Sequence, residues 1–378
     1  MKIGIDIRNI GKKRTGDEVV FFNIVKHLAL LDSTENYILF TDISDQKILT
    51  EIKEALGITN KPNFQIVSLK ARNKFDWNLR VLPAYLRKNP VDIYQTQYIT
   101  PLFVPRKIKI ATIVHDISFT KYPQFIKWSD LFFLKLFIPL SLRRANKIIG
   151  VSEFTRDEII NYYKIDPEKI DFIHNAVGDN FLKESSKEEL EAVRKKYALP
   201  PKFILYIGTL QPRKNLPTLI EAYAEAIKNK DEIKLVLAGG KGHNFDPKID
   251  NTIEKYDLKN DVLLPGYIDE KDKSAIFHLA HVFCFPSFYE GFGIPVLEAM
   301  TLGVPVLASN IPPHEEVAAG SALLFDVRNN RDMEKKLAQL CTDDNLRKDL
   351  SEKEKRQAQN FSWSKTAKKI LNIYKNLE

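Results

Sequence analysis

The stretch HVFCFPSFYEGFGIPVLEAMTLGVPVLAS, residues 281–309, holds the pattern that decides the fold. Its first part, His281–Ser287, is a short apolar run of the kind that forms a buried strand. A loop with two glycines follows, and Pro295 is typical of the first turn of a helix. A second apolar run, Val304–Ser309, comes after that helix. Two apolar runs joined by a helix predict two parallel strands with a right-handed crossover.

The same alternation extends in both directions, almost from end to end. In the first half, the apolar runs predicted as strands are Lys2–Ile7, Tyr37–Phe40, Phe64–Leu69, Val91–Gln95, Ile110–Asp116 and Lys147–Ser152. In the second half they are Phe203–Gly208, Ile233–Gly240, Val262–Gly266, His281–Ser287, Val304–Ser309 and Ala322–Val327. Two successive series predict an α/β protein with two Rossmann-like, doubly wound parallel-sheet domains.

The boundary between the two series is predicted in the charged stretch 179–201, which ends in Pro200-Pro201. We therefore assign residues 1–178 to an N-terminal domain and residues 179–361 to a C-terminal domain. The last segment has apolar residues at helical spacing and predicts a packed helix over residues 362–378.

Composition excludes several classes of protein. The 378 residues are 44% hydrophobic and 28% charged, which excludes a disordered or fibrous chain. Lys and Arg total 57 against 49 Asp and Glu, a net charge of +8 that is too diffuse to predict a nucleic-acid partner. The two cysteines, Cys284 and Cys341, cannot form a disulfide framework or a four-cysteine zinc site.

Hydropathy predicts a cytoplasmic protein with at most a peripheral contact to a membrane. The N-terminal apolar run is broken by Asp6 and Arg8, so it does not resemble a secretory signal. The most apolar stretch, Leu131–Leu142, is interrupted by Lys135 and is far shorter than the roughly 20 residues of a spanning helix. The surrounding basic and aromatic residues, 125–147, fit either a core helix or an anionic membrane surface.

The loops after the strands hold the candidate site residues, because ligands of open α/β sheets bind at the carboxyl ends of strands. Arg213 and Lys214 follow the strand Phe203–Gly208 and precede a helix. Two cations beside a helix N-terminus fit a diphosphate, and a solvated loop is the alternative.

Two carboxylates flank the glycine-rich turn of the opening stretch. Glu290 lies in the loop beside Gly291 and Gly293, whose lack of a side chain lets a ligand approach the backbone. Glu298 is expected in the first turn of the following helix, where favourable interaction with the helix dipole is its alternative role. A dinucleotide fingerprint is disfavoured, because Val296 stands where its third glycine would be.

The remaining candidates are weaker when taken singly. His115 follows Ile110–Val114 at the carboxyl edge of that strand and could donate to a substrate oxygen, or be a core histidine. Other residues lie at or just after the carboxyl ends of strands, as parts of a site or of plain turns: Gly16, Gly208, Gly239, Gly266 and Tyr267. No Asp-x-Asp pair occurs in the chain, so no metal is expected.

Four stretches carry a resemblance to a known family. They are FYEGFGIPVLEAMTLGVPVLASNIPPHEEV, YIGTLQPRKNLPTLIEAY, VHDISF and IIGVSEFTRDEI. Together they resemble the retaining glycosyltransferases of family 4, whose Glu, seven residues, Glu signature is matched by Glu290 and Glu298. They look especially like its O-antigen mannosyltransferase-like branch. The resemblance implies the B-type glycosyltransferase fold, with two Rossmann-like domains facing across a cleft and the terminal helix crossing back to the first.

The resemblance also implies a donor and roles for the site residues. Arg213 and Lys214 would bind the diphosphate of a nucleotide sugar, and Glu298 the ribose. Glu290 and His115 would contact the transferred sugar, with the backbone of Gly291, Phe292, Gly293 and Ile294 beside the phosphates or the sugar. The N-terminal domain would then serve the acceptor, and the C-terminal domain the donor. The loop Thr15–Glu18 departs from the family pattern, because it keeps one glycine and has Asp17 in place of an arginine.

The implied reaction is transfer of a sugar, best assigned as mannose from GDP-mannose, to a glycan or lipid-linked hydroxyl in surface polysaccharide synthesis. The resemblance implies retention of configuration, and the missing Asp-x-Asp pair leads us to expect no metal. Two alternatives remain open: a nucleotide-sugar epimerase on the same fold, and a non-catalytic subunit that binds nucleotide sugars.

Overall fold

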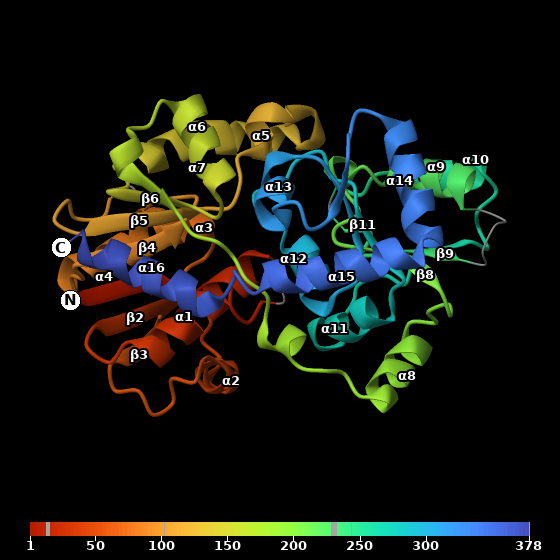
Figure 1. The fold of residues 1–378 in the computed structure, drawn as a ribbon. Helices are drawn as coiled ribbons and strands as arrows, with labels where there is room; N and C mark the ends of the chain where they lie inside the picture. The colour runs from red at the N-terminus through yellow and green to blue at the C-terminus, as the bar shows by residue number, and fades with distance from the viewer. Residues whose placement is uncertain (13–15, 102, 228–232, 243, 378) are drawn as a thin grey trace. The chain divides into compact units, whose positions relative to one another are not determined.

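The computed structural model describes residues 1–12, 16–101, 103–227, 233–242 and 244–377 (Figure 1). Within these residues the chain forms two compact units. Unit 1 comprises Met1–Thr120, Trp128–Asn175 and Ser362–Glu378, and unit 2 comprises Lys121–Lys127 and Ala176–Phe361. The loop residues Lys13, Arg14 and Thr15 lie outside the described residues.

Unit 1 contains a parallel sheet of seven strands among the residues described. The strands are β1 (Lys2–Asp6), β2 (Asn36–Thr41), β3 (Phe64–Ser68), β4 (Ile93–Gln97), β5 (Lys109–Val114), β6 (Lys147–Gly150) and β7 (Ile170–Phe172). Their order is β3-β2-β1-β4-β5-β6-β7. The direction of winding therefore reverses between β1 and β4, which are paired in the middle of the sheet.

Helices cover this sheet, and the terminal helix is one of them. They are α1 (Asp17–Leu31), α2 (Gln46–Leu56), α3 (Lys74–Asp76), α4 (Leu82–Lys88), α5 (Ser118–Lys121), α6 (Trp128–Arg144), α7 (Glu153–Tyr163) and α16 (Trp363–Lys375). Figure 1 shows α16 in blue beside α1. The Thr366 hydroxyl donates to the His174 carbonyl at 2.5 Å, and the Tyr374 hydroxyl donates to Gln95. These contacts attach the end of the chain to unit 1.

One helical stretch of unit 1 changes its hydrogen bonding in the middle. A π-helix, η1 (Trp77–Val81), separates α3 from α4. Pro83 near the start of α4 has no N–H to donate to the preceding turn, which disfavours regular α-helical bonding there. The buried Trp77 side chain points from η1 into the core.

Unit 2 contains a second parallel sheet, of six strands within the described residues. The strands are β8 (Phe203–Ile207), β9 (Lys234–Ala238), β10 (Val262–Leu263), β11 (Val282–Phe285), β12 (Val306–Ser309) and β13 (Leu323–Phe325). Their order is β10-β9-β8-β11-β12-β13, so the winding reverses between β8 and β11. Every residue of β8 and β11 is buried, as expected for strands covered on both faces.

The helices of unit 2 begin and end at recognisable signals. They are α8 (Lys187–Lys196), α9 (Leu216–Ala226), α10 (Lys248–Lys255), α11 (Glu270–Leu279), α12 (Ile294–Leu302), α13 (Pro312–Ala318), α14 (Asn330–Thr342) and α15 (Asp344–Ala358). Ser186 and Glu189 form a capping box at the start of α8. Gly293 precedes α12 and Gly303 follows it.

Two parallel α/β units confirm the predicted fold class. The division differs from the predicted one in two places. Unit 2 resumes at Ala176 rather than at residue 179, and the short segment Lys121–Lys127 also belongs to unit 2, although α5 and α6 on either side of it lie mainly in unit 1. The reason for the second difference is aromatic packing: the Tyr122 and Phe125 rings lie 6.3 and 6.1 Å from the Phe288 ring. Asn244 also donates to the Phe125 carbonyl at 2.6 Å.

Candidate active site

The strongest candidate site lies where the winding of the unit 2 sheet reverses. β8 and β11 are neighbours there, and the loops after their carboxyl ends lie side by side. The loop after β8 contains Arg213 and Lys214, and the loop after β11 contains Glu290. Open α/β sheets bind their ligands at such reversal points.

Arg213, Lys214 and Glu290 form one buried ionic cluster. Lys214 Nζ lies 2.5 Å from Glu290 Oε1, and Arg213 Nη1 lies 3.2 Å from Glu290 Oε2. Arg213 also donates to the Tyr289 carbonyl, and the Phe288 N–H donates to the Arg213 carbonyl at 3.0 Å. Lys214 is 7% exposed. The two loops therefore hold each other through main-chain as well as side-chain contacts.

The cluster keeps Glu290 ionised. Burial by itself would raise the pKa of this carboxyl, but the charges of Arg213 and Lys214 lower the pKa to about 2. One carboxylate among two cations leaves a net charge of +1. This local charge suits an anionic ligand such as a diphosphate.

The glycine turn after Glu290 directs backbone donors to the same place. Gly293 has φ of 107°, a left-handed conformation that favours glycine, and precedes the first residue of α12. Among the described residues, the N–H groups of Gly293 and Ile294 have no hydrogen-bond partner. Free N–H groups at the N-terminus of a helix attract negative charge.

The position of Pro295 predicts Glu298 in the first turn of its helix, and this prediction is wrong. α12 begins at Ile294, so Glu298 is its fifth residue and faces the interior at 2% exposed. Its Oε1 accepts from Lys273 Nζ at 2.6 Å, and its Oε2 has no partner among the described residues. Burial raises the pKa of Glu298 although the Lys273 charge opposes this. The helix-dipole role is thereby excluded, because Glu298 is past the first turn.

Lys273 is a residue of this site that the sequence analysis missed. It lies on α11 and shares a helix face with the buried Ile276 and Phe277, three and four residues further on. A lysine on an apolar helix face indicates a buried partner, and this signal was available in the sequence. Burial by itself would lower the pKa of Lys273, but the charges of Glu298 and Glu270 raise it above its usual value. Tyr267, which is 53% exposed, is near enough to add to this increase.

Gly208, Gly239 and Gly266 of unit 2 occupy backbone positions with local structural requirements. A Cβ on Gly239 would lie 2.0 Å from the Gly208 carbonyl oxygen, so the ends of β8 and β9 require close backbone approach there. Gly266 has φ of 81° and no atom near its missing side chain. Their predicted contacts with the donor stay predictions.

His115 and Gly16 belong to unit 1. His115 Nε2 lies 3.0 Å from Gln97 Oε1, and burial lowers the pKa of His115 although Asp17 and Asp116 oppose this. A neutral imidazole that donates from Nε2 to Gln97 leaves Nδ1 as an acceptor rather than a donor. Gly16 has φ of 71° and precedes α1.

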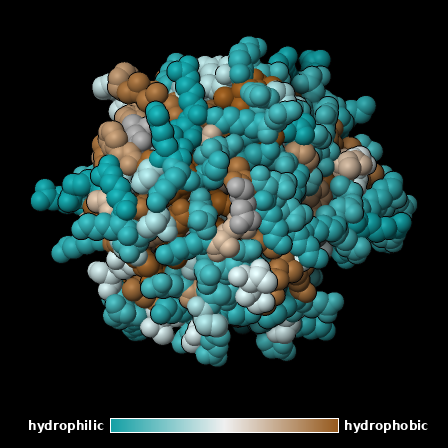
Figure 2. Space-filling view, turned by 90° about the vertical axis from the view of Figure 1, so that its left-hand side faces the viewer, coloured by the Kyte–Doolittle hydropathy of each residue, from teal (hydrophilic) through white to brown (hydrophobic). Residues whose placement is uncertain are grey.

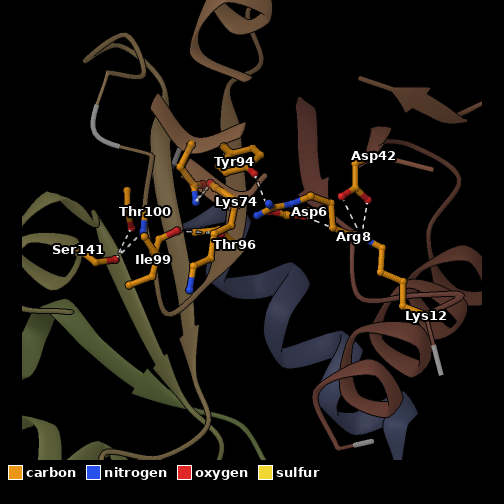
Figure 3. A network of polar contacts seen from close by, with 11 residues as sticks. Asp6, Arg8, Lys12, Asp42, Lys74, Tyr94, Thr96, Ile99, Thr100 and Ser141 are labelled. Atoms are coloured by element: carbon orange, nitrogen blue, oxygen red, sulfur yellow. Dashed lines mark hydrogen bonds and ion pairs between the residues drawn. The ribbon is translucent and has the colours of Figure 1, made fainter. Parts of the chain in front are cut away.

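The reversal point of the unit 1 sheet contains polar residues that the sequence analysis did not select (Figure 3). Arg8 donates to both carboxylate oxygens of Asp6, from Nε at 2.9 Å and from Nη2 at 2.7 Å. The Tyr94 hydroxyl lies 3.2 Å from the same carboxylate, and Arg8 stacks 4.4 Å over Trp77. Lys12 pairs with Asp42 at 2.6 Å. Charged residues at the end of a buried strand and just after it are the signal that could have identified Asp6 and Arg8.

Two family models match consecutive parts of the chain. One, described as Glycosyltransferase Family 4, covers residues 16–181, and the other, Glycosyl transferases group 1, covers residues 188–357. This chain is a glycosyltransferase. The resemblance to family 4 noted from its motifs is confirmed by the match over residues 16–181.

Curated relatives and solved structures agree with this family. O-antigen chain mannosyltransferase B of Escherichia coli is 29% identical over 303 residues, which are 80% of this chain and 77% of that protein. The serotype-specific mannosyltransferase WbdA of Escherichia coli is 32% identical over 227 residues, 59% of this chain and only 28% of that protein. A glycosyltransferase from Rickettsia africae has the same fold, with a TM-score of 0.75 and 21% identity over 100% of this chain and 98% of that one.

The described residues include neither a cluster of metal ligands nor a membrane-spanning helix. No group of three or more His, Cys, Asp or Glu side chains within them is arranged to hold a metal ion. None of the helices described for this glycosyltransferase combines the length and the apolar character needed to cross a bilayer.

Proposed function

We propose that this glycosyltransferase transfers a sugar from a nucleoside diphosphate sugar to a hydroxyl of a glycan or lipid-linked acceptor. The observation that carries the proposal is the Arg213–Lys214–Glu290 cluster beside the free Gly293 and Ile294 N–H groups, at the reversal point of the unit 2 sheet. Breaking the bond between sugar and phosphate develops negative charge on the diphosphate. Fixed cations and N–H groups stabilise that charge without reorganisation.

The nucleoside and the sugar are assigned to different carboxylates. Glu298 Oε2 is the acceptor for a ribose hydroxyl, since its other oxygen is occupied by Lys273. The exposed Tyr267 ring offers a stacking surface for the base. Glu290, ionised and adjacent to the glycine turn, accepts from sugar hydroxyls and stabilises the positive charge that develops on the sugar.

We propose retention of anomeric configuration and independence of metal. The proposal of retention rests on the family. The acceptor hydroxyl would attack from the face of the departing diphosphate, so that a donor phosphate oxygen takes the acceptor proton. Metal independence rests on the cationic cluster, which supplies the positive charge that a divalent ion supplies elsewhere. His115, with a free Nδ1 acceptor, is assigned to the transferred sugar.

GDP-mannose is the proposed donor and surface polysaccharide the proposed product, because similar curated proteins are named as an O-antigen chain mannosyltransferase and a serotype-specific mannosyltransferase. The test is turnover of a panel of nucleotide sugars, with the anomeric configuration of the product read by NMR. Transfer from GDP-mannose with retention supports the proposal. Release of an epimerised nucleotide sugar supports the epimerase, and no binding or turnover of any donor contradicts the enzyme assignment.

We propose that α6 contacts an anionic membrane surface, so that the enzyme acts at its inner face. Trp128, Phe132, Leu136 and Leu140 recur every fourth residue, and all are exposed, Trp128 at 83%. Figure 2 shows apolar surface near the top of the molecule, at the height of α6 in Figure 1. The exposed Lys135 and Arg143 flank this row, an arrangement that fits anionic headgroups.

Vesicle flotation tests the membrane contact. We expect the protein to float with phosphatidylglycerol vesicles and not with phosphatidylcholine vesicles. The double variant Phe132→Ser with Leu136→Ser should no longer float. Leu30→Ser is the matched control, because Leu30 is as exposed as Phe132 but lies on α1. Equal flotation of the α6 double variant and the control contradicts the assignment.

A further inference from the structure

His314 occupies a buried position directly beneath the glycine turn of the donor site. It lies on α13 and is fully buried, with its ring 5.6 Å from the Phe285 ring of β11. A Cβ built on Gly293 would lie 3.1 Å from His314 Cδ2 and 3.5 Å from Nε2. The backbone of Gly293 therefore packs against the edge of the imidazole, and its φ of 107° strains any other residue at this position.

A chain of hydrogen bonds fixes the ring. His314 Nδ1 lies 2.9 Å from the Ser309 carbonyl oxygen, and since a carbonyl only accepts, Nδ1 carries the proton. The Ser309 hydroxyl donates to the Ser287 carbonyl at 2.6 Å. Ser309 ends β12, and Ser287 starts the loop that leads to Glu290. His314 thus bonds to the end of β12 at Ser309 and packs against the glycine turn at Gly293. Ser309 extends the chain to Ser287, in the segment that leads into the turn.

The remaining ring nitrogen is a buried acceptor without a partner among the described residues. Burial lowers the pKa of His314 to about 4, although the nearby Glu290 charge opposes this, so the ring is neutral in ordinary buffers. A buried polar atom without a partner destabilises the folded state. A phenylalanine or leucine would fill the same space without this cost, so packing alone does not explain a histidine here.

We propose that His314 is a positioning residue, which holds the turn Gly291–Ile294 and thereby Glu290 in the arrangement that acts on the transferred sugar. This inference rests on the proposed function of the cluster. The support for it is the contact with Gly293, the tie through Ser309 to Ser287, and the polar edge retained in a fully buried place.

His314→Phe keeps a ring of similar size and removes the donor to Ser309. We expect kcat to fall about tenfold or more, because small displacements of a reacting group reduce rates by such factors. Affinity for free nucleoside diphosphate should fall by a smaller factor than kcat, since Arg213, Lys214 and Glu298 still hold the nucleotide. His314→Asn, which keeps an N–H near Nδ1, should recover part of the lost rate. The control is His281→Phe, at the amino edge of the same sheet, which should leave kcat unchanged.

A double variant separates positioning from a general structural effect. If His314 acts through Glu290, Glu290→Gln with His314→Phe should be no slower than Glu290→Gln alone. If the kcat losses of the two single variants multiply in the double variant, the proposal is overturned. An unchanged kcat in His314→Phe overturns it as well.

Hydrogen exchange tests the same point without turnover. Amides of residues 287–297 should exchange faster in His314→Phe than in the wild type or in His281→Phe. The faster exchange is expected even if the wild type transfers no sugar. Failure of the proposed function can therefore be told apart from failure of this inference. Unchanged exchange in this segment overturns the inference.

Discussion

Lys214 Nζ lies 2.5 Å from Glu290 Oε1, although the two residues are 76 positions apart in the chain. Each follows a strand, and those strands are neighbours only because the sheet reverses its winding between β8 and β11. The ionisation of Glu290 therefore depends on the same two cations, Arg213 and Lys214, that we propose to bind the diphosphate. Removal of either cation should affect both.

Arg213→Ala and Lys214→Ala are expected to weaken binding of a free nucleoside diphosphate about 10- to 100-fold, since each removes a charge-assisted contact worth about 1.5–3 kcal/mol. Isothermal titration calorimetry measures the affinity. Lys241→Ala is the control, because Lys241 follows β9 and pairs with Asp250 on the surface. If both variants bind like the control, the diphosphate lies elsewhere.

Glu298→Gln should weaken free nucleoside diphosphate and donor alike, because Glu298 serves the ribose. Glu290→Gln should instead lower kcat while leaving nucleoside-diphosphate affinity nearly intact, because its contact strengthens as the sugar acquires positive charge. Gln preserves size, so little packing is lost. Calorimetry and donor kinetics on both variants check the assignment. The opposite pattern would mean that the two roles are exchanged, and full activity in both would make the turn purely structural.

Transfer should survive treatment with EDTA, because Arg213 and Lys214 supply the charge that would otherwise require a divalent ion. The measurement is the initial rate before and after chelation, then after Mg²⁺ or Mn²⁺ is added back. Loss of activity on chelation and its return with metal would contradict the role given to the two cations.

Glu354 on α15 should make unit 2 less stable at alkaline pH. Burial raises the pKa of this carboxyl to about 8, although a hydrogen bond from the Val306 N–H opposes the shift. The folded state therefore binds the proton more tightly than the unfolded chain. This stability is fully present below about pH 4.5 and is lost as the pH rises through 8, by up to a few kcal/mol.

Glu354→Gln tests this dependence, because Gln keeps an acceptor for Val306 and never ionises. The variant should melt at a higher temperature than the wild type at pH 9 and at nearly the same temperature at pH 5. Glu352→Gln, an exposed neighbour on α15, is the control. Parallel pH profiles for Glu354→Gln and the wild type would show that Glu354 does not titrate in this range.

Much of the site could be predicted from local sequence. Residues in the loops after buried strands, such as Arg213, Glu290 and His115, were identified because parallel strands end at one edge of a sheet. The apolar helix face around Lys273 indicates burial of this lysine, but it does not identify the partner, because Glu298 is on a different helix. His314 was missed because its role depends on a contact with Gly293, 21 positions earlier, and no local pattern encodes that contact.

Periodicity and composition by themselves determined the two α/β units, because apolar runs buried on both faces can only be covered by helices on both sides of a parallel sheet. Motif spacing determined the family. Only the tertiary structure decided that Arg213 and Lys214 surround Glu290, that Glu298 meets Lys273, and that the segment Lys121–Lys127 packs on Phe288. The physical reason is that strand order and side-chain contacts between distant elements arise from packing, whereas the period of an element is written in consecutive residues.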